Sequence, residues 1–164
     1  MDTATALIAE NAAFAGLLRD ADLSIQVPTC PEWTLEQLMR HMGRGDCWSA
    51  QIVAEKLTEP LDPRTVVGGK PPAGRDNEID WLTDGVRALI DAVEETGPQT
   101  PVWTFLGMRP AEWWIRRRLH DPAAAADGIT EYLERVMIRA AENDPAHGGE
   151  PLRAGHCGTA RPRP

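Results

Sequence analysis

The sequence has few cysteines, no long apolar run and no excess of basic side chains. Its 3 cysteines are odd in number and form no Cys-x-x-Cys pair, so we expect reduced thiols in a cytoplasmic protein. No apolar run approaches the roughly 20 residues of a membrane helix, and no basic stretch precedes an apolar one at the N-terminus. With 17 basic and 25 acidic side chains, the formal charge of −8 argues against nucleic acid as a partner.

Strand patterns are also missing, whereas helical patterns recur along most of the chain. No alternation of apolar and polar residues reaches strand length. Apolar residues recur at helical spacing over about 3–20, 34–56, 77–95, 110–120 and 129–143, with a proline- and glycine-rich loop at 60–74. The 164 residues suffice for one core. We therefore predict an all-α fold, an up-and-down helical bundle over residues 1–143.

The C-terminal segment 144–164 differs in composition. It contains 4 prolines, 4 glycines and one sizeable aliphatic residue, Leu152. Such a segment cannot bury enough apolar surface to offset the entropy lost on ordering it. The loose spacing of His147, His156 and Cys157 does not favour a metal site that could order this segment. We therefore predict a disordered tail.

The segment 27–43 is where the sequence points to chemistry. After a turn bracketed by prolines, Thr34 and Gln37 have the types and the spacing of a capping box at the start of a helix. His41 follows Leu38 by three residues, so both lie on one face of that helix. One histidine is not a site, and spacing alone favours a residue at the edge of the core over a metal ligand.

Three motifs, in this order, resemble those of a known family. They are Val27-Pro-Thr-Cys-Pro with Trp33-x4-Leu38-x2-His41, then Trp103-Thr-Phe-Leu-Gly with Trp113-Trp-Ile-Arg-Arg-Arg-Leu-His120, then Asp121-Pro-Ala-Ala-Ala-Ala-Asp-Gly-Ile-Thr-Glu-Tyr-Leu133. Over about residues 6–152 the chain resembles the metal-binding N-terminal domain of the mycothiol-dependent maleylpyruvate isomerase family. That domain belongs to the wider DinB-like group of four-helix bundles.

The resemblance implies a metal site and a thiol cofactor. Members bind a divalent metal, typically zinc, through a His of the second helix and a Glu and a His spaced i, i+4 on the fourth. The metal would activate the thiol of mycothiol toward an electrophilic small-molecule substrate, for isomerisation or thiol transfer.

The chain departs from this family pattern after Leu119-His120. Members continue with Glu, three residues and His, whereas Asp121-Pro122 follows directly here and ends the helix early. His120 aligns with the residue before the family's Glu, and Ala125, four residues after Asp121, has no ligand atom. The candidate metal ligands are therefore His41, His120 and Asp121, and two expected ligands are missing. The resemblance also ends near residue 152, before the smaller α/β domain that members usually carry. We expect impaired catalysis, and the sequence assigns no catalytic or cofactor-binding residue.

Three functions remain open. The chain is a metal- and mycothiol-dependent enzyme, a bundle that has lost catalysis, or an interaction module. In the third case a short fourth helix leaves the Trp113-Trp114 surface open to a second subunit in a homodimer. The neighbouring run at 116–118 is expected to be a solvated arginine face rather than a phosphate site. Large apolar side chains at helical spacing are expected to pack: Trp33, Leu38, Trp81 and Trp113.

Overall fold

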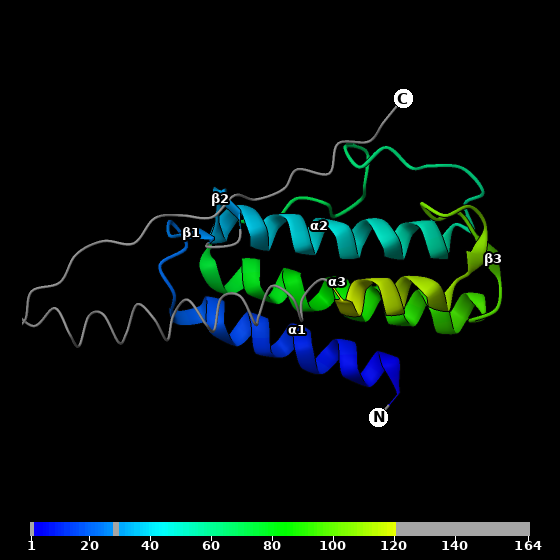
Figure 1. Ribbon diagram of the computed structural model, residues 1–164, viewed down its shortest axis with the longest axis horizontal. Helices are drawn as coiled ribbons and strands as arrows, with labels where there is room; N and C mark the ends of the chain where they lie inside the picture. Colours follow the sequence, from blue (N-terminus) through cyan, green and yellow to red (C-terminus); the bar gives the residue numbers. More distant parts are fainter. Residues whose placement is uncertain (1, 28–29, 121–164) are drawn as a thin grey trace, which may run out of the picture.

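The computed structural model describes residues 2–27 and 30–120 of the chain. Within them lie α1 (Thr3–Asp20), α2 (Leu35–Ala54), α3 (Arg75–Thr96) and a helical segment at residues 112–120. The three long helices run side by side, with α3 between α1 and α2 (Figure 1). The described residues are therefore mostly helical, as predicted. The predicted helix at 129–143 and the predicted tail at 144–164 lie outside them.

Helices α2 and α3 run in the same direction, so the up-and-down prediction is wrong at this connection. An ion pair between Arg40 and Glu78 joins their N-terminal ends at 3.1 Å, and the Thr96 hydroxyl donates to the Val53 carbonyl near their C-terminal ends at 3.2 Å. The physical reason is the length of residues 55–74, which lead back along the bundle before α3 begins (Figure 1). A loop of this length easily spans the roughly 30 Å of a 20-residue helix such as α2.

Two short antiparallel ribbons accompany the helices, and the all-α prediction missed both. Strand β1 (Gln26–Val27) pairs with β2 (Cys30–Thr34), and β3 (Pro101–Val102) pairs with β4 (Arg109–Pro110). Three of these strands have 2 residues each, which is too short for an alternating pattern to be visible. Pro110 was predicted in the first helical turn, but it lies in β4, where a residue without an N–H fits at the edge of a ribbon.

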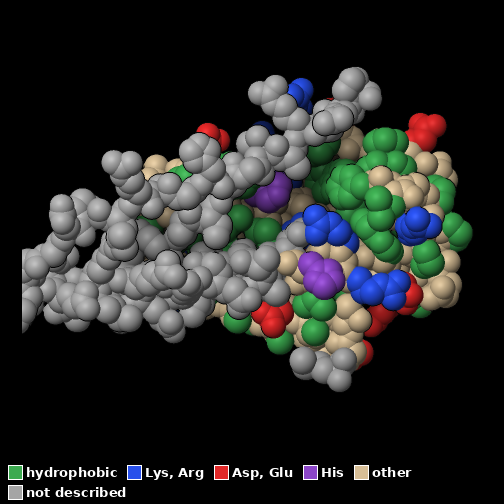
Figure 2. All heavy atoms as spheres, in the orientation of Figure 1, with side chains coloured by type: hydrophobic (Ala, Val, Ile, Leu, Met, Phe, Trp, Pro, Cys, Tyr) green, Lys and Arg blue, Asp and Glu red, His purple; other side chains and the backbone are tan. Residues whose placement is uncertain are grey.

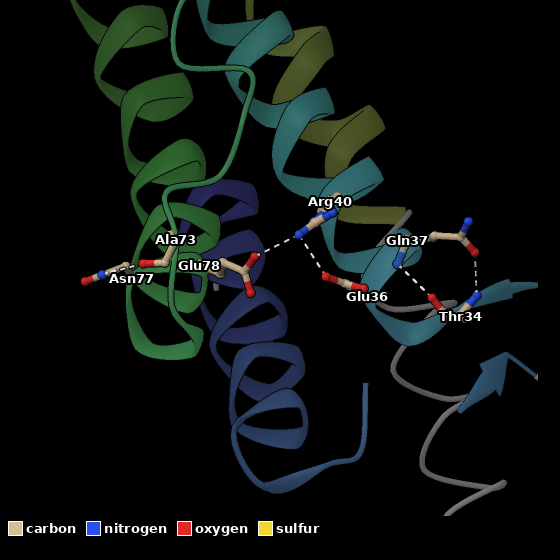
Figure 3. A network of polar contacts seen from close by, with 7 residues as sticks. All are labelled: Thr34, Glu36, Gln37, Arg40, Ala73, Asn77 and Glu78. Atoms are coloured by element: carbon tan, nitrogen blue, oxygen red, sulfur yellow. Dashed lines mark hydrogen bonds and ion pairs between the residues drawn. The ribbon is translucent and has the colours of Figure 1, made fainter. Parts of the chain in front are cut away.

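Side-chain caps fix the starts of α1 and α2. The capping box of α2 is confirmed: the Thr34 hydroxyl accepts from the Gln37 N–H at 3.2 Å, and the Gln37 side chain accepts from the Thr34 N–H at 2.8 Å (Figure 3). At the start of α1, the Asp2 carboxylate accepts from the Thr5 N–H at 2.9 Å. Hydrogen bonds from the backbone and the side chain of Thr5 lower the pKa of Asp2. A surface network around Arg40 then joins α2 to Glu78 of α3 (Figure 3).

The core has two parts. The first gathers buried residues of α1, the N-terminal halves of α2 and α3, and the segment between α1 and α2: Phe14, Ala15, Leu18, Leu23, Val27, Leu35, Met39, Met42, Ile79 and Leu82. The second joins the C-terminal halves of α2 and α3 to residues 111–115, and includes Ile52, Val53, Val86, Leu89, Val93, Ala111, Trp114 and Ile115. On α1, Ile8 is 46% exposed although it is one of the apolar residues at helical spacing over 3–20.

None of the helices in the described part of the chain is both long and apolar enough to cross a membrane.

Helices α2 and α3 approach closely at Gly43. A Cβ atom there would overlap the ring of Trp81, at 2.5 Å from Cη2, and the Trp81 indole N–H donates to the Gly68 carbonyl at 2.7 Å, which holds the ring in place. We expect Gly43→Ala to lower the free energy of unfolding by about 1–3 kcal/mol, because the overlap outweighs the higher helix propensity of alanine. Urea unfolding followed by circular dichroism measures it.

The matched control is Gly16→Ala on α1, where an added Cβ meets nothing within 4 Å. This variant should gain about 0.5–1 kcal/mol of stability, because alanine restricts the unfolded chain and favours the helix. The same sign for both variants would contradict the close approach at Gly43.

Candidate functional site

A pocket with a volume of about 420 Å³ lies between α2 and the 112–120 helical segment. The residues that line it come from α2, the 55–74 loop, the β3–β4 connection and the 112–120 segment: His41, Arg44, Gly45, Trp48, Ser49, Pro63, Phe105, Trp114, Arg117 and Arg118. In the space-filling view, histidine, basic and apolar side chains adjoin one another on one face of the molecule (Figure 2). The pocket thus combines cationic and aromatic walls.

His41, the histidine singled out from the sequence, lines this pocket from the exposed side of α2. Its ring meets the ring of Trp33 edge to face, with centroids 5.0 Å apart and planes at 77°. Leu38, on the same helix, is partly buried against the core. His41 therefore lies on the side of α2 that borders the pocket, about two turns after the capping box that begins the helix.

Of the other two predicted metal ligands, the structure describes His120 and not Asp121. His120 is exposed at the last described helical residue and is not among the described residues that line the pocket. Asp121 lies outside the described residues, so the set of His41, His120 and Asp121 stays a prediction. Over residues 2–27 and 30–120, no three His, Cys, Asp or Glu side chains lie together in a way that could hold a metal ion.

A buried ion pair that the sequence reasoning missed forms the floor of the site. The Arg118 Nε donates to Asp46 Oδ1 at 2.7 Å, and their side chains are 7% and 2% exposed. The Arg118 Nη2 also donates to the Met42 carbonyl at 2.9 Å. Gly45 makes room for the guanidinium, since a Cβ there would lie 2.8 Å from Nη1. Arg118 is thus held between two turns of α2.

The prediction of a solvated face at 116–118 is therefore wrong for Arg118. The signal was present in the spacing: Arg118 follows Trp114 by four residues, so both lie on the buried face of one helix. Arg116, by contrast, is exposed and pairs with Glu112 at 3.1 Å one turn earlier. Each arginine in such a run must therefore be assigned to its own face of the helix, because adjacent residues point in different directions.

The aromatic wall of the pocket is a packed cluster of four rings. Trp48, Trp103, Phe105 and Trp114 have neighbouring centroids between 5.3 and 6.4 Å apart. The indole N–H of Trp114 donates to the Trp103 carbonyl at 3.1 Å, and that of Trp48 donates to the Leu61 carbonyl at 2.9 Å. These bonds fix both rings, because a buried indole N–H needs an acceptor.

The predicted open surface at Trp113-Trp114 is wrong for Trp114, which is 1% exposed. Its burial follows from the contacts with Trp48 and Trp103 described above, which the sequence spacing did not reveal. The large apolar side chains exposed in this region belong instead to the β3–β4 connection: Phe105 at 59%, Leu106 at 65% and Met108 at 43%.

Cys47, next to Asp46 on α2, is an unreactive thiol. Burial, followed by the charge of Asp46, raises its pKa to about 11. Because the thiolate is the form that attacks electrophiles and binds metal, Cys47 is poorly suited to either role at neutral pH.

The lining of the pocket does not fit the divalent metal that the family resemblance implies. Among its described residues, His41 is the one imidazole, whereas Arg44, Arg117 and Arg118 carry permanent positive charges. A guanidinium has no lone pair to offer a metal and repels a second cation.

A family model described as mycothiol maleylpyruvate isomerase N-terminal domain matches residues 4–126. The matched range contains α1 from its second residue, all of α2 and α3, the 112–120 segment and the described residues that line the pocket. No curated protein and no solved structure gives a significant match to the chain.

Proposed function

Since the chain belongs to the mycothiol maleylpyruvate isomerase N-terminal domain family, we propose that it is a small-molecule-binding member of that family with a DinB-like helical fold and impaired metal-dependent catalysis. The small molecule binds in the pocket between α2 and residues 112–120. Mycothiol, as the thiol, and an electrophilic substrate of isomerisation or thiol transfer come into this proposal from the family alone. So does zinc as the metal, whereas the cytoplasm as the location comes from the reduced thiols that the sequence predicts.

The observation that carries the proposal is the composition of the pocket wall. A divalent metal supplies acid chemistry in such a site when three side chains donate to it. Among the described residues that line the pocket, His41 is the one imidazole, and the guanidinium groups of the three arginines beside it have no lone pair for a metal. What these residues can do is bind and orient an anionic small molecule through their N–H groups and exclude water from its apolar part.

The metal content of the purified full-length protein tests this proposal. We expect far less than one zinc per chain after incubation with zinc and removal of the excess, measured by elemental analysis for the wild type and for His41→Ala. Near-stoichiometric zinc that is lost in His41→Ala would overturn the proposed impairment, because other residues would then complete the site. Thiol-dependent isomerase activity in the zinc-treated wild type would overturn it as well.

The alternative is a non-catalytic interaction module that forms a homodimer. The observation in its favour is the exposed apolar side chains of Phe105, Leu106 and Met108 beside the pocket, because such residues tend to be covered in an assembly. A metal-free chain that associates with itself as its concentration rises would favour this alternative.

A further inference from the structure

We propose that a second hollow, beside the pocket, binds a phosphate group, either as the free ion or on a small phosphate monoester. This hollow has a volume of about 440 Å³, is lined by α2 and by residues between 63 and 70, and shares Arg44 and Pro63 with the pocket. The phosphate oxygens lie against Arg44, Arg64 and Lys70. The inference goes beyond the proposed function, because it concerns a different hollow and no metal ion.

Among the described residues, the lining of this second hollow carries three positive charges and no negative one. Besides Arg44, Arg64 and Lys70, the lining is neutral: Pro63, Val66, Gly68 and Gly69. Within residues 2–27 and 30–120, no ion pair joins any of the three cations to a carboxylate. The acid nearest in sequence, Asp62, accepts from the backbone N–H of Arg64 at 2.9 Å and does not line the hollow.

The guanidinium of Arg44 is oriented by a neutral group. Its Nε donates to the Gly69 carbonyl at 3.1 Å, which ties the side chain of α2 to the loop that forms the other wall. A carbonyl carries no formal charge, so this bond fixes the guanidinium without cancelling its positive charge. Because a guanidinium has five N–H donors, Arg44 keeps donors that can serve an oxyanion.

The loop that supplies Arg64 and Lys70 is anchored to two helices, although residues 55–74 contain no helix or strand. The Val67 N–H donates to the Gln51 side chain of α2 at 3.0 Å, and the Trp81 indole N–H of α3 donates to the Gly68 carbonyl at 2.7 Å. Long connections without secondary structure that are nevertheless ordered are usually functional. The anchoring also means that little backbone freedom is lost when an ion binds.

The charge of the second hollow matches a phosphate better than a carboxylate. A phosphate monoester carries a charge of about −1.5 to −2 at pH 7 and three acceptor oxygens, whereas a carboxylate carries one negative charge. Guanidinium groups bind phosphate through paired N–H donors, and a lysine adds a compact point charge. Because the whole chain has a formal charge of −8, a general attraction for anions is not expected, and binding depends on this local group of cations.

Titrations of the isotope-labelled full-length chain, followed by nuclear magnetic resonance, test the proposal with three probes: inorganic phosphate, glycerol 3-phosphate and glycerol. We expect both phosphates to shift the amide signals of residues 64–70 in a saturable way at millimolar concentration, and less strongly as sodium chloride is added. Glycerol should shift none of them. Tighter binding of glycerol 3-phosphate than of inorganic phosphate would identify a monoester as the ligand, and equal binding would identify the free ion.

Variants locate the phosphate within the second hollow. Arg64→Gln and Lys70→Gln should each weaken the binding of both phosphates roughly three- to tenfold, because one charge-assisted contact is lost. Lys56→Gln is the matched control, since Lys56 is an exposed lysine of the same connection that does not line the hollow. It should bind both phosphates as the wild type does. Arg64 and Lys70 are exposed as well, so the amide spectra should show that all three variants fold.

Three results would overturn the inference. The first is that neither phosphate shifts the signals of residues 64–70 in a saturable way at millimolar concentration. The second is unchanged phosphate binding in the double variant Arg64→Gln/Lys70→Gln. The third is a loss in Lys56→Gln as large as the loss in Lys70→Gln, because phosphate would then respond to the charge of the chain and not to this hollow. None of these results depends on the zinc content that tests the proposed function.

Discussion

Replacing Asp46 with leucine should lower the free energy of unfolding by about 3–5 kcal/mol. The substitution leaves the Arg118 guanidinium in the core, 7% exposed, without the carboxylate that accepts from it at 2.7 Å. Breaking a buried ion pair by removing one partner is costly, because the remaining charge loses that interaction and regains little hydration. Urea unfolding of the full-length chain, followed by tryptophan fluorescence and by circular dichroism, measures the loss.

Two further variants test whether the loss of stability comes from breaking the buried ion pair. The double variant Asp46→Leu/Arg118→Met should recover most of the lost stability, because replacing both charges with apolar groups removes the unpaired charge. Asp84→Leu is the surface control, since Asp84 pairs with Arg87 at 3.1 Å with both side chains about two-thirds exposed. It should change stability by less than about 1 kcal/mol. If the double variant lost as much stability as Asp46→Leu alone, or more, the two residues would not act as a pair.

The same pair shows why this part of the site was difficult to predict. Asp46 and Arg118 are 72 residues apart, so no local pattern joins them. Both are charged, and charged residues are almost never fully buried unless they are paired. The spacing from Trp114 to Arg118 gave the face of the helix, whereas the partner on α2 depends on how two distant helices pack. The burial of this ion pair is therefore determined by tertiary contacts.

Local signals were sufficient where a feature depends on neighbouring residues. The capping box of Thr34 and Gln37 predicted the start of α2, and the apolar spacing predicted the extents of α1 and α3 to within about two residues. The parallel course of α2 and α3 was not predicted, because apolar spacing defines a buried face but no direction. The long 55–74 connection was the available hint, since short loops favour antiparallel neighbours.

The candidate site, too, was predicted in part from local sequence and depends for the rest on tertiary packing. His41 was identified because a histidine beside an apolar helix face is visible in the sequence. Several of its neighbours in the pocket come from segments more than 60 residues later in the chain: Phe105, Trp114 and Arg117. Their side chains give the described lining of the pocket an aromatic and arginine-rich character that the spacing around His41 did not predict.

Replacing Trp114 with alanine should lower the free energy of unfolding by about 3–5 kcal/mol. Its side chain is among the largest that are fully buried, and it contacts the rings of Trp48, Trp103, Phe105 and Trp113. The substitution removes these contacts, leaves a cavity, and takes away the N–H that donates to the Trp103 carbonyl at 3.1 Å. Urea unfolding measures the effect, and light scattering at two concentrations reports the oligomeric state.

Trp113→Ala is the matched control, because the neighbouring tryptophan is only partly buried. It should cost clearly less than Trp114→Ala, since fewer contacts are lost and no deep cavity forms. Trp114→Phe should fall between them, because it keeps most of the ring volume but not the N–H donor. If Trp114→Ala instead left stability unchanged and altered only self-association, Trp114 would be an interface residue and the aromatic wall of the pocket would lose its central ring. A large loss of stability with no change in oligomeric state would place Trp114 in the core of a single chain, where it supports the pocket from behind.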